Sequence, residues 1–196
     1  MIIGEIFRKA DENPQFGQGL ILGISYIFKY LSVDDRNQIF ERMLCNHKEN
    51  ILLTKSLGEG SGYHFLSLKT VQQEELFQKV KNYKDFAEGF GNGIGQIYDR
   101  FDSILQLQIL KFIGGTKEFD RRFGYQIGNR FPSLNHYIRK EILQKISKTE
   151  TTDEFTDYFV TGVMNSFKYL EIDSQNELTS IILQKKPELV KKIQEL

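Results

Sequence analysis

Few residues of this chain have the types and spacing that catalysis or metal binding requires. The three histidines are His47, His64 and His136, and none has a second histidine or a cysteine at ligand spacing on a shared helix face. Cys45 and His47 are the closest pair, but residues two apart on a helix do not face each other. A nucleophile–base pair there would also lack an orienting third group. We expect no catalytic residue, no metal ligand and no cofactor.

Carboxylates are plentiful toward the C-terminus, where two interpretations apply. The favoured one is a solvated helix face; the other is an acid–base pair, which would need convergent polar groups in a pocket. The residues concerned are Asp153, Glu154, Asp157, Glu171, Asp173 and Glu177.

The charge is balanced overall but uneven along the chain. Lys+Arg and Asp+Glu number 26 each, so no global field attracts nucleic acid or an anionic membrane. Residues 115–148 carry eight basic and three acidic residues, whereas 149–183 carry seven acidic residues and one basic residue. Pairing between neighbouring units is the favoured explanation, and a basic patch for an acidic partner is the alternative. The predicted partner-binding residues of that patch are Arg121, Arg122, Arg130 and Arg139.

The elements that would position these residues follow from a hidden repeat of apolar residues. Steps of four, four, four and three predict one stripe of a long α-helix, and a shorter apolar stripe follows each polar break. Each of the five units has five long-stripe and three short-stripe positions, 40 in all. Only Ser61 and Thr179 among these 40 residues are not apolar, and 14 of the 16 Phe occupy such positions. The long stripes are Phe16/Leu20/Ile24/Phe28/Leu31, Leu53/Leu57/Ser61/Phe65/Leu68, Phe86/Phe90/Ile94/Tyr98/Phe101, Phe119/Phe123/Ile127/Phe131/Leu134 and Phe155/Phe159/Val163/Phe167/Leu170.

This period predicts a single all-α domain over residues 1–196. We expect a short α-solenoid of about five stacked helical hairpins, each a long helix, a loop and a shorter helix, with half-units at both ends. Ile3, Ile6 and Phe7 would form the first half-unit. The predicted units are 13–47, 48–82, 83–115, 116–149 and 150–184, followed by a C-terminal helix over 187–196.

The loops contain helix-capping residues. Ser32–Asp35, Asp102–Ser103 and Asp173–Ser174 are predicted to cap the second helix of their hairpins. Pro132 falls near the end of the fourth long helix and is expected to kink or shorten it.

Small residues recur at fixed places on the long helices. Gly58/Gly60/Gly62 and Gly91/Gly93/Gly95 occupy the same repeat positions, and Gly124, Gly128, Gly162 and Gly23 follow the pattern in part. The favoured interpretation is close approach of neighbouring helices; the alternative is a groove for a ligand. A third interpretation makes residues 58–62 a phosphate-binding loop, although no Gly-Lys-Ser/Thr follows and no strand precedes it.

Long polar residues stand at one position near the start of every second helix. They are Arg36, Gln73, Gln106, Arg139 and Gln175. Bonding to backbone carbonyls of the next unit is the favoured role, and a row that grips a peptide is the alternative.

The layout resembles the α-solenoid repeats of the HEAT and armadillo type, as a likeness of architecture. The stretch Phe90–Gln96 is also similar to the base-reading helix of Pumilio-type RNA-binding repeats, with Asn92, Gly93 and Gln96 at the reading positions. That resemblance implies RNA recognition and covers one helix, since the other units offer different residues there.

These observations predict a non-catalytic scaffold or adaptor that binds a protein or peptide. A nucleic-acid binder using the basic fourth unit is a less favoured alternative, and an enzyme or small-molecule carrier is the third. The most apolar run, 19–28, is too short for a membrane span. An early acidic residue and a single cysteine favour the cytoplasm. The sequence does not indicate an oligomeric state.

Overall fold

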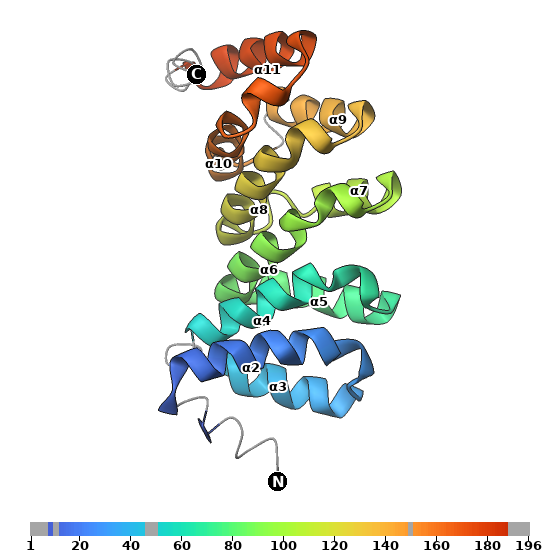
Figure 1. Ribbon diagram of the computed structural model, residues 1–196, viewed down its shortest axis with the longest axis vertical. Coiled ribbons are helices and arrows are strands. Elements are labelled where there is room, and N and C mark those ends of the chain that lie inside the picture. The colour runs from blue at the N-terminus through green and yellow to red at the C-terminus, as the bar shows by residue number, and fades with distance from the viewer. Residues whose placement is uncertain (1–7, 10–11, 46–50, 149–150, 188–196) are drawn as a thin grey trace. The chain divides into compact units, whose positions relative to one another are not determined.

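The described chain is all-helical (Figure 1). The computed structural model describes residues 8–9, 12–45, 51–148 and 151–187, and the regular structure in these ranges is α-helix or 3-10 helix. The chain divides into two compact units, Met1–Ile94 and Gly95–Leu196, and the division falls within α6 (Lys84–Gln96).

The element order is a long α-helix, a 3-10 turn and a second α-helix, five times in succession. The N-terminal unit begins with α2 (Pro14–Ile27), η1 (Phe28–Tyr30), α3 (Val33–Cys45), α4 (Ile51–Tyr63), η2 (Phe65–Ser67) and α5 (Thr70–Asn82). After α6 follow η3 (Tyr98–Arg100), α7 (Ser103–Leu110), α8 (Lys117–Arg130), η4 (Phe131–Ser133), α9 (His136–Ser147), α10 (Asp153–Met164), η5 (Phe167–Tyr169) and α11 (Ile172–Lys185).

The end of each predicted long helix is a separate 3-10 turn. The last residue of each predicted stripe therefore leaves the helix: Leu31, for example, has an extended backbone with φ −71° and ψ 144°. Pro132 is expected to kink or shorten the fourth long helix, and α8 does end at Arg130, two residues before it. Pro132 lies in the first turn of η4, and the other four hairpins form the same turn without proline, so the turn does not depend on it. A missing N–H is harmless in the first turn of a helix.

The predicted stripes form the core of four hairpins. On α4, α6, α8 and α10 their side chains are buried, and aromatic rings meet at short range: the centroids of Phe119 and Phe123 lie 4.8 Å apart. The first hairpin differs, because Phe16 is 47% exposed and Leu20 and Ile24 are half-buried. Ile21 is fully buried there instead.

Two of the three predicted caps are confirmed. The amide of Asp35 donates to Ser32 Oγ at 3.1 Å, and that of Leu105 donates to Asp102 Oδ1 at 2.8 Å. The third is wrong, because α11 begins at Ile172, two residues earlier than a cap at Asp173 would place it. Glu171 is its N-cap residue without a side-chain hydrogen bond, and Asp173 lies inside the first turn.

Within the N-terminal unit the long helices α2, α4 and α6 lie side by side. Cβ atoms built on Gly58 and Gly93 would overlap the carbonyl oxygens of Phe86 and Glu59, so α4 and α6 touch through their backbones. Later residues of α4 meet later residues of α6, so both helices run in the same direction. The favoured interpretation of the glycines, close helix approach, is confirmed for this pair.

Within the C-terminal unit α8 packs on α10, and the shorter helices α7, α9 and α11 follow one another in contact. Asn135 Nδ2 donates to Ser103 Oγ at 3.3 Å, and Arg139 Nη1 donates to Ser174 Oγ at 3.5 Å. These bonds bring the N-terminal ends of the three shorter helices to one edge of the unit.

Some predictions fall outside the described residues. These are the half-unit at Ile3, Ile6 and Phe7 and nearly all of the helix expected over 187–196. Among the helices that the structure does describe, none combines the length and apolarity that crossing a bilayer requires.

Candidate functional site

The four predicted arginines do not form one patch. Arg121 and Arg130, on α8, are nine residues apart and therefore point to opposite sides of that helix. Arg121 lies against α10, whereas Arg130 Nη1 lies 3.5 Å from Asp99 Oδ2 in η3. Arg122 is exposed, and Arg139 lies on α9. Only Arg121 and Arg122 are neighbours, and both lie on α8. The candidate surface is therefore centred on α8.

Arg121 contacts an aromatic ring of the neighbouring helix. Its guanidinium carbon lies 5.5 Å from the centroid of the Tyr158 ring, a cation–π contact between α8 and α10. Arg121 Nε is buried and has no hydrogen-bond partner among the residues that the structure describes. A guanidinium has five N–H donors and suits a carboxylate or phosphate that accepts two of them. Arg121 is therefore oriented toward α10 with hydrogen-bonding capacity left over.

Glycines bring α8 and α10 close enough for short side chains to meet. A Cβ built on Gly124 would lie 2.7 Å from the carbonyl oxygen of Phe155, and Cβ atoms on Gly128 and Gly162 would overlap backbone carbonyl oxygens of the facing helix. At this separation an asparagine on one helix can reach an asparagine on the other.

Asn129, Asn165 and Tyr125 form a hydrogen-bonded cluster across that contact. Asn165 Nδ2 donates to Asn129 Oδ1 at 3.0 Å and to the Tyr125 hydroxyl at 3.3 Å, and Asn129 Nδ2 donates to the Tyr125 carbonyl at 2.9 Å. Asn165 is exposed and Asn129 is half-buried. Each amide offers two donors and a carbonyl acceptor, so capacity remains for a ligand. We call Arg121, Tyr125, Asn129, Tyr158 and Asn165 the α8–α10 surface.

Charge pairing between the fourth and fifth hairpins is confirmed at one edge of this surface. Lys117 Nζ lies 2.9 Å from Glu154 Oε1. The bond between them raises the pKa of Lys117 and lowers that of Glu154. Two further carboxylates that the sequence placed on a solvated face, Asp153 and Asp157, lie 3.0 and 3.2 Å from Lys186 Nζ.

Asp120 is a fully buried carboxylate at the start of α8. Its oxygens accept hydrogen bonds from Thr152 Oγ1 at 2.6 Å and from the Gly114 amide at 3.0 and 3.2 Å. Burial raises the pKa of the Asp120 carboxyl, although these hydrogen bonds oppose the rise. Asp120 therefore fastens the loop before α8 to the start of α10 and does not face the α8–α10 surface.

Four of the five residues in the predicted row bond inside their own hairpin, whereas Arg139 donates to Ser174 of the following one. The glutamines donate to carbonyls of their own 3-10 turn, and not to the next unit as expected. The contacts are Gln73 Nε2 to Phe65 O at 3.1 Å and Leu68 O at 3.3 Å, Gln106 Nε2 to Tyr98 O at 2.8 Å, and Gln175 Nε2 to Phe167 O at 3.2 Å and Leu170 O at 3.0 Å. Because these glutamine amides are bonded to their own turns, they offer little to a peptide.

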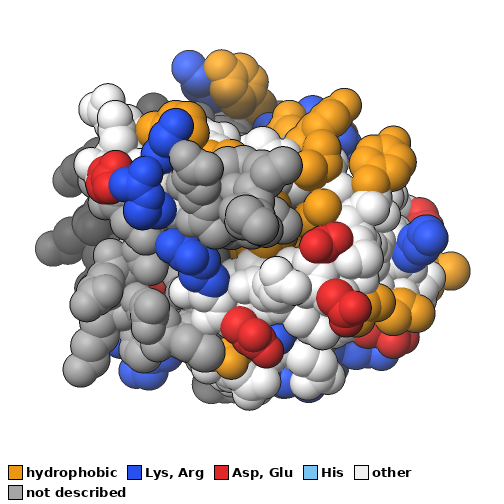
Figure 2. Space-filling view, turned by 90° about the horizontal axis from the view of Figure 1, so that it is seen from below, with side chains coloured by type: hydrophobic (Ala, Val, Ile, Leu, Met, Phe, Trp, Pro, Cys, Tyr) orange, Lys and Arg blue, Asp and Glu red, His pale blue; other side chains and the backbone are white. Residues whose placement is uncertain are grey.

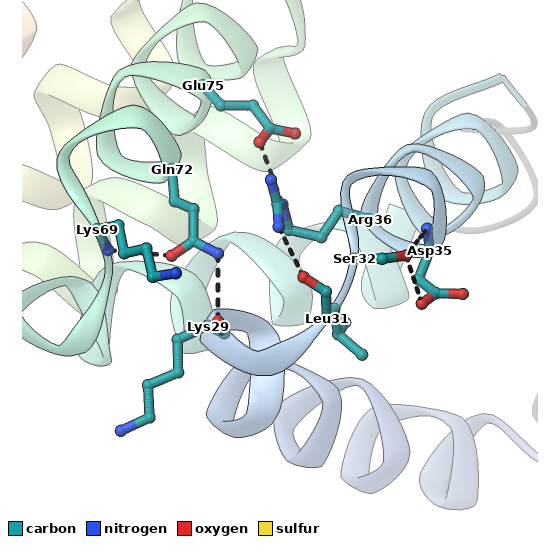
Figure 3. Close-up of polar contacts among 8 residues, drawn as sticks. All are labelled: Lys29, Leu31, Ser32, Asp35, Arg36, Lys69, Gln72 and Glu75. Carbon is teal, nitrogen blue, oxygen red and sulfur yellow. Dashed lines mark hydrogen bonds and ion pairs between the residues drawn. The ribbon is translucent and has the colours of Figure 1, made fainter.

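Arg36 has the same role in the first hairpin. Figure 3 shows its guanidinium between the Leu31 carbonyl, at 2.8 Å from Nη1, and Glu75 Oε2 of α5, at 3.2 Å from Nε. Gln72 makes a second link, because it accepts from the Lys69 amide and donates to the Lys29 carbonyl (Figure 3). Arg36 is only 5% exposed, so these contacts join neighbouring hairpins and do not form a ligand site.

The Pumilio-like positions are not presented together. Asn92 Nδ2 donates to Glu59 Oε1 at 2.8 Å, and a Cβ on Gly93 would overlap the Glu59 carbonyl oxygen. The middle reading position therefore faces a neighbouring helix. Gly162, which occupies that position in the fifth hairpin, is likewise closed by the Tyr125 carbonyl.

The phosphate-loop interpretation of residues 58–62 is wrong, because all five lie inside α4. His47 lies outside the described residues, and the ring of His64 packs edge-on against Tyr26 and Tyr63, with centroids 5.0 and 5.3 Å away. Burial, with a contribution from Lys29, lowers the pKa of His64. Across the described ranges, no group of three or more His, Cys, Asp or Glu is placed to hold a metal ion.

The asparagine pair was missed by sequence reasoning, although a signal was present. Asn129 and Asn165 occupy the same repeat position, six residues after Phe123 and Phe159. Their pairing depends on the distance between α8 and α10, and the spacing of repeats along the sequence does not determine that distance.

The chain matches no protein-family model, no curated protein and no solved structure.

Proposed function

We propose that this protein is a non-catalytic helical-repeat scaffold that binds an extended, acidic peptide across α8 and α10. The observation that carries the proposal is the aligned amide pair Asn129 and Asn165 beside Arg121, which is oriented by Tyr158. Side-chain amides suit a peptide backbone, since each can accept from a peptide N–H and donate to a peptide carbonyl.

The charge of the peptide follows from Arg121 and its neighbours. An acidic side chain would accept from the Arg121 guanidinium, and Arg122 would add attraction at longer range. The Tyr158 ring is 38% exposed and gives the peptide an apolar contact next to the charge. Rigid aromatic and arginine side chains commonly carry the largest share of binding energy.

The architecture we propose is a short α-solenoid of HEAT or armadillo type, formed by the five successive hairpins. Its support is the recurring element order and the side-by-side packing of long helices within each unit. In such arrays every hairpin buries its apolar face against the next, and one exposed face continues along the array as a binding surface. The absence of a disulfide-forming pair agrees with the cytoplasmic location that we expect.

The direct test is selection from a display library of short random peptides on the folded chain. We expect enrichment of acidic sequences. An Asn129→Ala/Asn165→Ala double variant should bind them at least about tenfold more weakly, because each lost amide bond removes roughly 1 kcal/mol. Arg121→Gln should lose the preference for acidic residues, with affinity measured by fluorescence anisotropy.

Lys140→Gln on α9 is the charge-matched control, since Lys140 is exposed and lies outside the α8–α10 surface. Selected peptides that bind all of these variants equally well would contradict the proposal. So would failure to enrich any peptide from a well-folded sample.

A nucleic-acid binder is the second candidate, favoured only by the basic segment 115–148. It requires an affinity for RNA or DNA that falls steeply with salt, because binding releases counterions. Weak or salt-insensitive binding of a single-stranded oligonucleotide would remove it. An enzyme or small-molecule carrier remains the third candidate and has no observation in its favour.

A further inference from the structure

Three aromatic side chains gather on the surface of the N-terminal unit, where α2 and α4 end. The ring of His64 meets Tyr26 of α2 and Tyr63 of α4 edge to face, with interplanar angles of 82° and 86°. Tyr26 is 63% exposed and Tyr63 is 43% exposed. The two tyrosines stand at one repeat position, six residues after Leu20 and Leu57, so two neighbouring long helices present them as a pair.

This cluster lies at the end of both helices and not at their beginning. Tyr26 and Tyr63 stand twelve residues after Pro14 and Ile51, the first residues of α2 and α4. A rise of about 1.5 Å per residue places the tyrosines about 18 Å from those first residues. The rings are therefore remote from the points at which the chain enters the two helices.

The polar ends of the three side chains have no protein partner in the described ranges. The hydroxyls of Tyr26 and Tyr63 and the ring nitrogens of His64 make no hydrogen bond there. Burial, with a contribution from Lys29, lowers the pKa of His64, so its ring is neutral at neutral pH and has one N–H donor and one acceptor nitrogen. Exposed rings with free donors and acceptors suit a planar ligand that stacks and forms hydrogen bonds, as a nucleobase does.

Two lysines lie beside the rings. The side-chain amide of Gln72 donates to the Lys29 carbonyl at 3.5 Å and accepts from the Lys69 amide at 3.0 Å, so the two lysines are neighbours (Figure 3). Lys29 is close enough to His64 to affect its pKa, and its Nζ lies 4.8 Å from the centroid of the exposed Tyr30 ring. Neither ammonium group has a carboxylate at ion-pair distance among the described residues. Two such cations next to exposed rings suit a ligand that carries phosphate.

We propose that Tyr26, Lys29, Tyr63, His64 and Lys69, the aromatic–lysine surface, bind a single-stranded nucleic acid. The bases stack on the rings, and the phosphates meet the two ammonium groups. Every base has a π-face, so this contact requires no particular base sequence. A duplex keeps its bases stacked inside the helix and cannot offer them to the tyrosines. An acidic peptide would use the lysines but would leave the rings without a partner.

The aromatic–lysine surface is made by residues of the N-terminal unit alone. It is therefore independent of the peptide site proposed on α8 and α10 and of the basic segment 115–148. Figure 2 looks onto α2 and α3; hydrophobic side chains, a class that includes tyrosine in this colouring, gather on one side of the visible surface with Lys and Arg side chains among them.

The test is fluorescence anisotropy of a labelled single strand of about ten uridines, titrated with the full chain at low salt. We expect saturable binding. Tyr26→Ala/Tyr63→Ala should raise the dissociation constant at least about tenfold, because two stacking contacts are lost. Tyr26→Phe/Tyr63→Phe keeps both rings and should stay within about threefold of the wild type.

Lys29→Gln/Lys69→Gln should also weaken binding, and should reduce the slope of log affinity against log salt by about 1.4, the value for two phosphate contacts on a single strand. Arg122→Gln/Lys140→Gln is the charge-matched control, since both side chains are exposed and lie in the basic segment of the other unit. This control should leave the dissociation constant within about twofold of the wild type. A thermal melt of each variant checks that it is folded, and the lysine variant decides if the ring variant is not.

A folded wild-type chain that does not bind the strand overturns the inference. A dissociation constant that the ring variant leaves unchanged, or that the control raises as much as the lysine variant does, also overturns it. Equal affinity for a duplex of the same length would show that the rings do not stack on bases. Binding of an acidic peptide that the ring variant weakens, in a chain that does not bind the strand, would assign the surface to a peptide instead.

Discussion

At the scale of the residue, the glycines on the long helices separate into two classes that composition alone does not distinguish. Gly162 lies against the Tyr125 carbonyl, whereas Gly23 has no described atom near it. Both occupy the same repeat position: Gly162 is three residues after Phe159, and Gly23 is three residues after Leu20. A glycine at such a position either permits a helix contact within the chain or is open to a partner, and substitution separates the two cases.

We predict that Gly162→Ala lowers the free energy of unfolding by about 1–3 kcal/mol, because the new methyl group would overlap the Tyr125 carbonyl and push α8 and α10 apart. Thr161→Ala, at the adjacent exposed position, is the matched control and should have little effect. Urea unfolding followed by far-ultraviolet circular dichroism measures both. Equal stability of the two variants would contradict the close approach.

Asp120 gives a prediction about pH. Burial raises the pKa of its carboxyl in the folded state above the ordinary value of 3.8, so the folded state holds this proton more tightly than the unfolded state. The contribution of Asp120 to stability is then fully present below pH 3.8 and is lost as the pH rises through the folded-state pKa. Asparagine does not ionise, so the Asp120→Asn variant should not lose this contribution to stability as the pH rises.

The measurement is urea unfolding of wild type and Asp120→Asn at a series of pH values. We expect the stability of the wild type relative to the variant to fall as the pH rises above 3.8. A relative stability that rises over this range would show instead that the hydrogen bonds from Thr152 and Gly114 outweigh burial.

At the scale of the element, four of the five hairpins are closed by a side chain near the start of the second helix. Gln106 is 2% exposed and donates to the Tyr98 carbonyl, and the Tyr98 hydroxyl donates back to the Gln106 carbonyl at 2.9 Å. Burial raises the pKa of Tyr98 well above its ordinary value, so the hydroxyl remains a donor. The buried Tyr98 carbonyl of the 3-10 turn is therefore paired.

Replacing Gln106 by Leu should cost about 1 kcal/mol of stability, because it removes the Gln106 hydrogen bond to the buried Tyr98 carbonyl and leaves only the Phe101 amide, at 3.3 Å, as a donor. Gln108→Leu is the control, since Gln108 is exposed on the same helix. Thermal unfolding compares the two. If both variants melt together with the wild type, the hairpin does not depend on this bond.

At the scale of the whole molecule, the proposed solenoid predicts an elongated particle. A compact globule of this length has a radius of gyration of about 16 Å. Five hairpin layers at about 10 Å per layer would raise it above about 18 Å. Small-angle X-ray scattering at concentrations where the chain is monomeric decides between them, and a value near that of the globule would contradict the proposed array.

The sequence by itself determined the helices, their order and most of the core. Aromatic and aliphatic residues at steps of three and four leave little choice of secondary structure, and on α4, α6, α8 and α10 they are buried as predicted. Ser32 and Asp102 were identifiable as caps for the same reason: capping is a contact between residues close in the chain.

Only the tertiary structure decided which repeated positions face a neighbouring helix, which lie inside a hairpin and which are open. The arginines looked like one patch in sequence, yet Arg121 and Arg130 point to opposite sides of α8. Asn129 and Asn165 became a pair because glycines set the distance between two helices. Periodicity describes directions around one helix axis, whereas a site depends on distances between helices, which packing sets.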